Sequence, residues 1–239
     1  MIRVAVSGAA GRMGRLVSEA VASAHDLELV AGYDPSGGAG ISTDPEAVSG
    51  ADVVVEFTVP DVVLDNLAAW RGRGVHAVVG TSGFDAERVE QLAQRWGSGP
   101  PNCLVVPNFS IGAVLMMRFA ELAAPHFAAS EIVELHHDHK ADAPSGTALA
   151  TAARMAEAGG PQQRAVESEE LAAGARGADA GGVRVHAVRL PGLLAHQEVL
   201  LGSPGETLTI RHDTSDRVSF MPGVLLAIRE VGSLSDPVT

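Results

Sequence analysis

Short β-rich runs alternate with helix-like stretches through the first 108 residues, and this alternation constrains the fold more than any other feature. The expected strands are residues 2–7, 27–33, 51–57, 76–80 and 104–107, with helices at 12–24, 62–72 and 86–96. Strands that alternate with helices form a parallel sheet with helices on both faces. Their nearly continuous valine, alanine and isoleucine content fits strands that are covered on both sides. The prediction is a doubly wound α/β domain with a parallel sheet.

The pattern changes after residue 110. Helices are expected at 111–124 and 146–158, with a short strand at 132–135 between them. Residues 159–182 are rich in Gly, Gln, Glu and Ala and are expected to form a long surface loop. Strands at 183–190, 194–201 and 207–211 and a helix at 220–231 are expected to follow. Runs of strands after helices indicate a second, smaller α+β domain with a mixed open sheet.

Charge and composition exclude several classes of partner. The formal net charge is −12, from 17 cationic and 29 acidic residues, so neither nucleic acid nor an anionic membrane is an expected partner. No apolar run reaches the roughly 18 residues that span a membrane, and the first residues show no signal-peptide pattern. Cys103 is the only cysteine, so no intrachain disulfide can form. A cytoplasmic protein is predicted.

Three glycines, Gly8, Gly11 and Gly14, follow the first strand directly and open a helix. Glycines at such a turn let the backbone approach a pyrophosphate and direct helix N–H groups toward it. The GxxGxxG spacing also occurs in ordinary strand-to-helix turns. Asp34 ends the second strand about 20 residues further on, where a carboxylate can accept hydrogen bonds from a ribose; alternatively it is a turn residue before Pro35. Together these features favour a Rossmann-like dinucleotide site.

Two further segments follow the fourth and fifth expected strands. They are Gly80, Thr81 and Ser82, and then Val106, Pro107, Asn108 and Phe109. The carboxyl ends of parallel strands form the edge where open α/β sheets bind ligands. Each segment is also compatible with a plain loop.

Residues 134–147 hold the densest chemistry of the chain, because three of the nine histidines lie within four residues beside Lys140. Metal ligation is one interpretation, since imidazole and carboxylate are good ligands, and a structural histidine cluster is another. The favoured interpretation is acid–base chemistry beside an anion site, because imidazole titrates near neutrality. Ser145, Gly146 and Thr147 then open a helix whose N–H groups suit a carboxylate, although a simple N-cap needs the same residues.

Lys140 is the only lysine among 17 cationic residues. Lysine can give up a proton when its environment shifts its pKa, whereas arginine stays protonated. The position therefore favours a role that needs an ammonium group.

These motifs resemble those of the dihydrodipicolinate reductase family of the diaminopimelate route to lysine. The most specific segment is 134–147, with the pattern E-L-H-H-x-H-K-x-D-A-P-S-G-T. The glycine turn fits G-x-x-G-R-M-G, and matches continue at residues 80–84 and 108–110. Further matches lie at Gly205, Glu206, Arg211, His212, Arg217 and Phe220. Serine replaces a frequent threonine at Ser82, and Pro35 stands where some members have an arginine.

The resemblance implies a nicotinamide domain of residues 1–108 with 216–239, and a substrate and tetramerisation domain of residues 109–215. It implies His136 as proton donor or acceptor and Lys140 as the second acid. His137, Ser145, Gly146 and Thr147 would bind the substrate. The cofactor would be lined by Gly8, Ala9, Ala10, Gly11, Arg12, Met13, Asp34, Gly80, Thr81, Ser82, Val106, Pro107, Asn108 and Phe109. No metal is implied.

The implied reaction is the reduction of a small cyclic dicarboxylate by NADH or NADPH. Because Asp34 favours a free ribose hydroxyl and Pro35 carries no charge, NADH is expected to serve at least as well as NADPH. An uncovered apolar face of the small sheet would favour association, and a homotetramer is expected. Two alternatives stay open, namely a dehydrogenase of the same architecture for another small acid and a non-catalytic dinucleotide-binding regulator.

Overall fold

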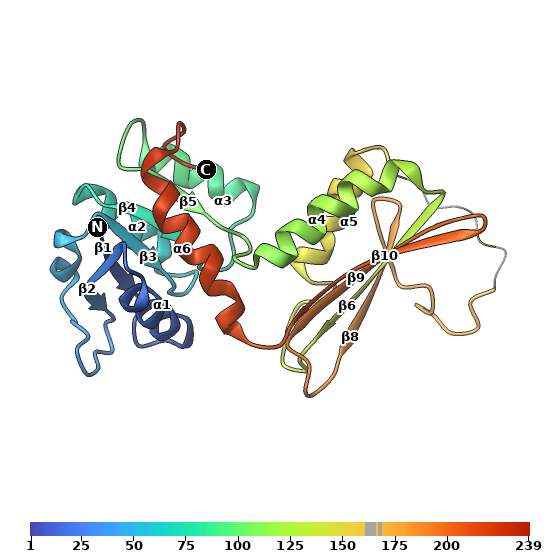
Figure 1. The fold of residues 1–239 in the computed structure, drawn as a ribbon, viewed down its shortest axis with the longest axis horizontal. Coiled ribbons are helices and arrows are strands. Elements are labelled where there is room, and N and C mark those ends of the chain that lie inside the picture. The colour runs from blue at the N-terminus through green and yellow to red at the C-terminus, as the bar shows by residue number, and fades with distance from the viewer. Residues whose placement is uncertain (161–165, 167–168) are drawn as a thin grey trace. The chain divides into compact units, whose positions relative to one another are not determined.

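The structure is a computed structural model that describes residues 1–160, 166 and 169–239. The chain divides into two compact units (Figure 1). Unit 1 joins Met1–Ser110 to Phe220–Thr239, and unit 2 is Ile111–Ser219.

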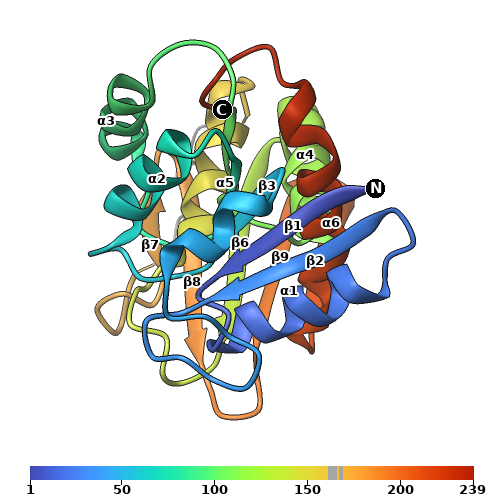
Figure 2. The same cartoon turned by 90° about the vertical axis from the view of Figure 1, so that its left-hand side faces the viewer.

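Unit 1 is built on a five-stranded parallel sheet with the order β2-β1-β3-β4-β5. The strands are β1 (Ile2–Ser7), β2 (Leu27–Tyr33), β3 (Val53–Glu56), β4 (His76–Val79) and β5 (Cys103–Val105). The helices are α1 (Arg12–Ser23), α2 (Val63–Gly72), α3 (Ala86–Trp96) and α6 (Met221–Glu230), with short 3-10 turns at Pro45–Gly50 and Val231–Ser233. A further 3-10 turn, Arg217–Phe220, connects unit 2 to α6. The predicted doubly wound architecture is confirmed (Figure 2).

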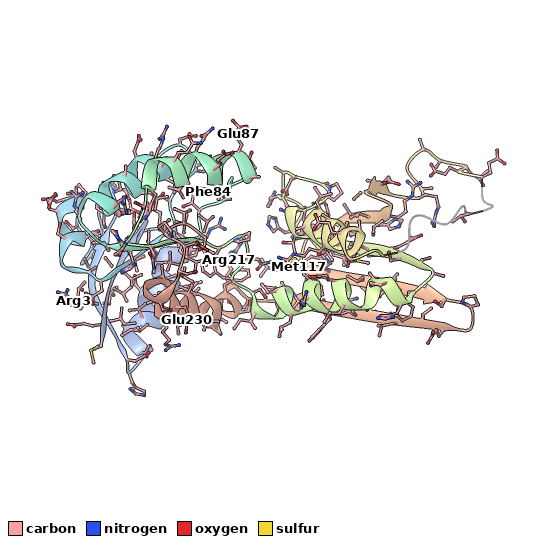
Figure 3. All side chains as sticks on the ribbon, turned by 90° about the horizontal axis from the view of Figure 1, so that it is seen from above. Arg3, Phe84, Glu87, Met117, Arg217 and Glu230 are labelled. Carbon is pink, nitrogen blue, oxygen red and sulfur yellow. The ribbon has the colours of Figure 1, made fainter. Side chains whose placement is uncertain are left out.

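Alternate strand residues face two separate apolar cores. Val4 and Val6 point into a core with Val17 of α1 and Val224 of α6. Ala5 points to the opposite core, which α2 and α3 cover with Leu67, Trp70, Leu92 and Trp96. Because side chains of a strand alternate between faces, the apolar stretch Val4–Val6 of β1 packs against both helix layers at once. On the α2 and α3 side, the Arg88 guanidinium lies 5.2 Å from the ring centroid of Phe84, which Figure 3 labels before α3.

The last residues of the chain protect an edge of this sheet. The Cys103 N–H donates to the Pro237 carbonyl at 2.7 Å, and the Val105 N–H donates to the Thr239 carbonyl at 2.7 Å. Val238 forms a parallel bridge with Cys103. Residues 237–239 therefore pair along β5 and satisfy backbone groups of an edge strand.

Unit 2 contains a mixed five-stranded sheet with the order β10-β9-β6-β8-β7. Its strands are β6 (Ala129–His136), β7 (Ala178–Ala180), β8 (Val183–Arg189), β9 (Ala195–Ser203) and β10 (Glu206–Thr214), and its helices are α4 (Ile111–Ala123) and α5 (Gly146–Glu157), with a 3-10 turn at Ala124–His126. Only β6 and β8 pair in parallel. Met117 of α4 is buried (Figure 3). The predicted α+β unit with a mixed sheet is confirmed.

Two expectations for unit 2 need correction. The strand expected at 132–135 runs from Ala129 to His136 and pairs on both sides, so it is a central strand. Its first residues are polar or small, which hid them from a search for apolar runs. The loop expected at 159–182 contains β7, a short exposed strand turned onto β8 at Gly181 and Gly182. Residues 161–165 and 167–168 of that loop lie outside the described residues.

The uncovered face of the unit 2 sheet also differs from expectation. Ala120 of α4 and Ala152 of α5 pack with Ile132 in one apolar cluster, so both helices cover the same face. The opposite face was expected to be apolar. It carries ion pairs, Glu131 with His186 and Arg211 with Glu198 and Asp213, beside apolar side chains such as Val133 and Leu200, so it is mixed and not uniformly apolar. Among the described residues, no helix is long and apolar enough to span a membrane.

Candidate active site

The glycine turn of unit 1 is fixed by close backbone approaches. A Cβ at Gly14 would lie 2.1 Å from the Gly8 carbonyl oxygen, and one at Gly8 would lie 2.3 Å from the Phe57 carbonyl oxygen. Gly8 also has a φ of 81°, in the left-handed region that favours glycine. These positions therefore accept only glycine without a shift of the backbone.

The backbone N–H groups of this turn divide into two sets. Gly8 and Ala9 both donate to the Tyr33 carbonyl, at 2.9 and 3.1 Å. The first intrahelical hydrogen bond of α1 runs from the Arg15 N–H to the Gly11 carbonyl at 3.1 Å, so the N–H groups of Arg12 and Met13 precede it. No acidic residue or side-chain cap occupies this end of α1. The cradle of glycines and open N–H groups fits a pyrophosphate.

Asp34 lies next to this turn, as predicted. Its carboxylate accepts hydrogen bonds from the Ala10 N–H at 3.2 Å and from the Ser36 hydroxyl at 2.6 Å. Burial opposes ionisation, yet the hydrogen bonds from Ser36 and Ala10 lower the pKa of Asp34 below its ordinary value. A hollow of about 400 Å³ adjoins the turn and is lined by residues that include Ala9, Ala10, Arg15, Gly32, Gly37 and Ile41. The ionised acceptor and the hollow suit the adenosine end of a dinucleotide.

Two of the predicted cofactor-lining residues after β4 and β5, Thr81 and Phe109, have buried side chains. The Thr81 hydroxyl accepts the Thr58 N–H at 3.0 Å and is buried. The Phe109 side chain belongs to the α1 and α6 core, and a Cβ at Gly80 would meet its ring at 2.7 Å. Ser82 is exposed. Thr81 and Phe109 therefore fix these loops with their side chains, whereas the side chains of Ser82 and Pro107 are exposed.

Glu56 is a buried residue of this region that the sequence analysis did not single out. Its carboxylate accepts the Asn66 amide at 3.0 Å and the Trp70 indole N–H at 2.8 Å, and it also accepts the Thr58 hydroxyl. Through Thr58 it reaches Thr81. Its position at the end of a strand that otherwise contains only valine could have indicated a buried carboxylate.

In unit 2, His136 ends β6 and its imidazole is held by a neighbour on the same strand. Nδ1 lies 2.5 Å from the Glu134 carboxylate, and the His136 side chain is 15% exposed. Since a carboxylate only accepts hydrogen bonds, the proton sits on Nδ1 and Nε2 is the basic nitrogen. Burial lowers the pKa of His136, Glu134 raises it, and the charges of Lys140 and Arg189 lower it further, with a net decrease. His136 is therefore neutral near pH 7.

Glu134 and Arg189 also lie in this site, and neither was predicted to have a role. Arg189 donates two hydrogen bonds to the Glu134 carboxylate, at 2.8 and 2.9 Å, and the Glu134 side chain is fully buried. The Ser145 N–H donates to the same carboxylate at 3.1 Å. Glu134 could have been noticed because it stands in the histidine motif. Arg189 comes from β8, 55 positions away, and only the strand register brings it here.

The N-terminus of α5 is already occupied by groups of the chain. The Ser145 hydroxyl accepts the Ala148 N–H at 3.2 Å. The Asp142 carboxylate lies 2.6 Å from the Lys140 ammonium. The hydrogen bond from Lys140 lowers the pKa of Asp142, and the Gly146 N–H contributes in the same direction. Of the donors predicted for a substrate carboxylate, the Ser145 N–H is therefore bound to Glu134 and the Gly146 N–H interacts with Asp142.

The remaining predicted residues lie around this centre. His137 is half-buried, with its ring centroid 6.5 Å from that of His139, and Thr147 stands in the first turn of α5. Within residues 1–160, 166 and 169–239, no group of three or more His, Cys, Asp and Glu side chains is placed to hold a metal ion. The structure thus brings His136, Lys140 and the start of α5 together within unit 2.

A Rossmann-like unit with an open helix N-terminus, together with a unit that carries a histidine beside a lysine, is typical of nicotinamide-dependent oxidoreductases. Family models described as "Dihydrodipicolinate reductase, N-terminus" and "Dihydrodipicolinate reductase, C-terminus" match residues 2–109 and 112–237. The chain belongs to the dihydrodipicolinate reductase family and is an NAD(P)H-dependent enzyme.

Relatives agree over almost the whole chain. A 4-hydroxy-tetrahydrodipicolinate reductase of Cutibacterium acnes is 56% identical over 237 residues, which cover 97% of this chain and 93% of the relative. One from Nocardia farcinica is 55% identical, with the same coverage. A dipicolinate-bound dihydrodipicolinate reductase from Paenisporosarcina sp. TG-14 superposes with a TM-score of 0.87 at 39% identity and covers 100% of this chain and 97% of its own. A myo-inositol dehydrogenase of Corynebacterium glutamicum shares only the fold, with a TM-score of 0.60 at 18% identity and coverage of 98% and 90%.

Proposed function

We propose that this oxidoreductase reduces 4-hydroxy-tetrahydrodipicolinate to tetrahydrodipicolinate in the diaminopimelate route to lysine, with His136 and Lys140 as its proton-transfer residues. The observation that carries the proposal is the placement of a neutral imidazole and an ammonium group beside the N-terminus of α5. A nicotinamide cofactor supplies a hydride when it is bound. The chain must supply the rest, which is a carboxylate site and protons.

The overall change replaces a ring hydroxyl by hydrogen, so one hydride and one proton are consumed and one water leaves. Lys140 donates a proton to the departing hydroxyl or stabilises negative charge that develops on the ring. His136 transfers a proton through Nε2, because Nδ1 is engaged by Glu134. Gly146 and Thr147 cradle a substrate carboxylate at the start of α5, Ser145 caps the same turn, and His137 contacts the substrate.

In unit 1, the proposed pyrophosphate ligands are the N–H groups of Arg12 and Met13. Gly8, Ala9, Ala10 and Gly11 shape the turn, and Asp34 accepts the ribose hydroxyls. Gly80, Thr81, Ser82, Val106, Pro107, Asn108 and Phe109 form the loops toward the nicotinamide. NADH serves at least as well as NADPH, because Asp34 is ionised and Pro35 is uncharged. Arg15 lines the hollow beside the turn and supports use of NADPH as well.

The proposal includes a cytoplasmic homotetramer assembled through unit 2. Exposed side chains of α4 recur at one-turn spacing, with Leu115 46%, Phe119 51% and Leu122 54% exposed. Such an apolar stripe favours association of copies. The lone thiol, Cys103, is buried and free, as suits a reducing compartment. Light scattering that finds a stable monomer at micromolar concentration would contradict the tetramer.

The test is a steady-state assay with the enzymatically generated substrate and either NADH or NADPH, followed by the loss of nicotinamide absorbance. Turnover with both cofactors is expected. Turnover only with another small acid would favour the alternative dehydrogenase, and NADH binding without turnover would favour the regulator. A kcat/KM for NADPH more than about a hundredfold above that for NADH would contradict the cofactor assignment.

A further inference from the structure

The Glu134 carboxylate is the most completely bound acidic group of the described part of unit 2. Its side chain is 0% exposed, and both of its oxygens accept two hydrogen bonds each. Oε1 accepts Arg189 Nη2 and the Ser145 N–H, whereas Oε2 accepts Arg189 Nη1 and His136 Nδ1. A charge removed from water is tolerated when its lone pairs are satisfied in this way. Such a group has one fixed position.

Arg189 extends this network to Lys140. The same Nη2 that donates to Glu134 at 2.8 Å also donates to the main-chain carbonyl of Asp142 at 2.6 Å. The Asp142 side chain in turn holds the Lys140 ammonium at 2.6 Å. One planar guanidinium therefore ties the strand that carries His136 to the loop that carries Lys140.

The sheet register explains why Arg189 can do this. β6 and β8 are parallel, and His136 is paired with Arg189 across them. Paired residues of neighbouring strands point to the same face, so Glu134, His136 and Arg189 all point to one side of the sheet. This is the face on which α5 packs.

We propose that Glu134 and Arg189 are positioning residues that fix the His136 imidazole and the Lys140 ammonium relative to each other. Glu134 holds the proton of His136 on Nδ1, so that Nε2 alone exchanges protons with the substrate. Arg189 keeps Glu134 in place and anchors the 140–142 segment. Lysine cannot replace it, because a single ammonium lacks the planar fork that binds both carboxylate oxygens. The inference rests on the proposed function of His136 and Lys140.

The experiment compares Arg189→Lys and Glu134→Gln with the wild type. Both variants are expected to lose about tenfold to a hundredfold in kcat, with the NADH dissociation constant unchanged, because alignment of acid–base groups is lost. In Glu134→Gln, the pKa of His136, followed by its ring proton resonances, is expected to move down, since the carboxylate raises it. The acid limb of the pH–rate profile should move with it.

The matched control lies elsewhere in the same sheet. Arg176, Glu131 and His186 form a second arginine–glutamate–histidine group, with His186 Nε2 2.8 Å from Glu131. Arg176→Lys and Glu131→Gln should leave kcat and the pH profile at wild-type values. These variants report what the loss of an ordinary ion pair costs in thermal stability.

The outcomes separate the two proposals. A wild type that does not turn over the substrate overturns the proposed function. A wild type that does, with variants that lower only the melting temperature and keep kcat and the pH profile, overturns the positioning role. If Glu134→Gln does not fold, Arg189→Lys decides alone, because it keeps the positive charge. Calorimetry with pyridine-2,6-dicarboxylate then reports whether the carboxylate site survives in that variant.

Discussion

The two units offer helix N-termini to anions in opposite ways. In unit 1, α1 begins at a glycine turn with no side-chain cap and with the N–H groups of Arg12 and Met13 available. In unit 2, α5 is capped by the Ser145 hydroxyl, and the Asp142 carboxylate sits with Lys140 and Gly146. The N-terminus of α1 is open because glycines there carry no side chains. The N-terminus of α5 is instead surrounded by side chains of the chain itself.

The two helix N-termini should therefore tolerate different substitutions. The glycine turn of unit 1 depends on close approach of backbone segments, so ligand binding there should weaken when a side-chain atom is added. The site in unit 2 depends on proton positions and ion pairs, so its activity should fall when a charged group is replaced by one of similar size but different acidity. Unit 1 should therefore be sensitive to added atoms, and unit 2 to changes of charge or proton position.

The largest effect is expected from Lys140→Arg in unit 2. Arginine keeps the charge but cannot readily give up a proton, so kcat should fall by at least about a hundredfold. His136→Gln should cost a similar factor. The NADH dissociation constant and the melting temperature should stay near wild type, because unit 1 is untouched. Retention of more than about a third of wild-type kcat would show that any cation suffices at this position.

The next effect is expected from Gly14→Ala in unit 1. The new methyl group would lie 2.1 Å from the Gly8 carbonyl oxygen, so α1 must move away from the turn. NADH affinity, measured by fluorescence titration, should weaken by about tenfold or more, while pyridine-2,6-dicarboxylate affinity is retained.

Gly72→Ala is the control for this substitution, since nothing lies within 4 Å of the added Cβ. Alanine is the better helix former, so this variant should bind NADH normally and gain slightly in stability. Equal NADH affinity in both variants would refute the steric basis of the cradle.

A smaller effect of opposite sign is expected from Asp142→Asn. The Asp142 side chain is 57% exposed, and exposed ion pairs are weak, at about 0–1 kcal/mol. Removing its charge frees Lys140 and Gly146, so pyridine-2,6-dicarboxylate should bind about two- to fivefold more tightly. Weaker binding, measured by calorimetry, would mean that Asp142 helps to build the carboxylate site.

The smallest effect concerns acid stability. Burial lowers the pKa of His136 and His212 in unit 2 and of His76 in unit 1. The unfolded chain therefore binds protons first, so stability falls as the pH drops below about 6.5 toward the folded-state pKa values. Hydrogen exchange at pH 7 and 5.5 should show the greater loss in unit 2. A greater loss in unit 1 would contradict this assignment.

The sequence predicted features that are local along the chain. The glycine turn was visible because its constraints lie within seven residues and one neighbouring strand. The alternation of strands and helices gave the architecture of unit 1 for the same reason. The hydrogen-bond network around His136 could not be predicted, since Glu134 and Arg189 meet only through the register of β6 and β8. A sequence alone does not distinguish a charged side chain that is buried in an ion pair from one that is exposed at the surface.

Two other features escaped prediction for related reasons. β7 carries no apolar pattern and exists because Gly181 and Gly182 turn it onto β8. Residues 237–239 contain a proline and a threonine and resemble a terminal tail, yet they pair with β5. In both cases a neighbouring strand supplies the hydrogen bonds, and pairing of this kind leaves little trace in the segment itself.

The return of the chain to unit 1 at residue 220 has a consequence for biosynthesis. Residues 220–239 supply Val224 and Ile228 to one core of unit 1 and the segment that pairs along β5. A ribosome releases all of unit 2 before it releases these residues, and domains generally fold as units during synthesis. Unit 2 can thus finish folding while unit 1 still lacks one covering helix and has an open sheet edge. We therefore expect unit 1 of the nascent chain to remain prone to aggregation until residues 220–239 are released, although most of it is made first.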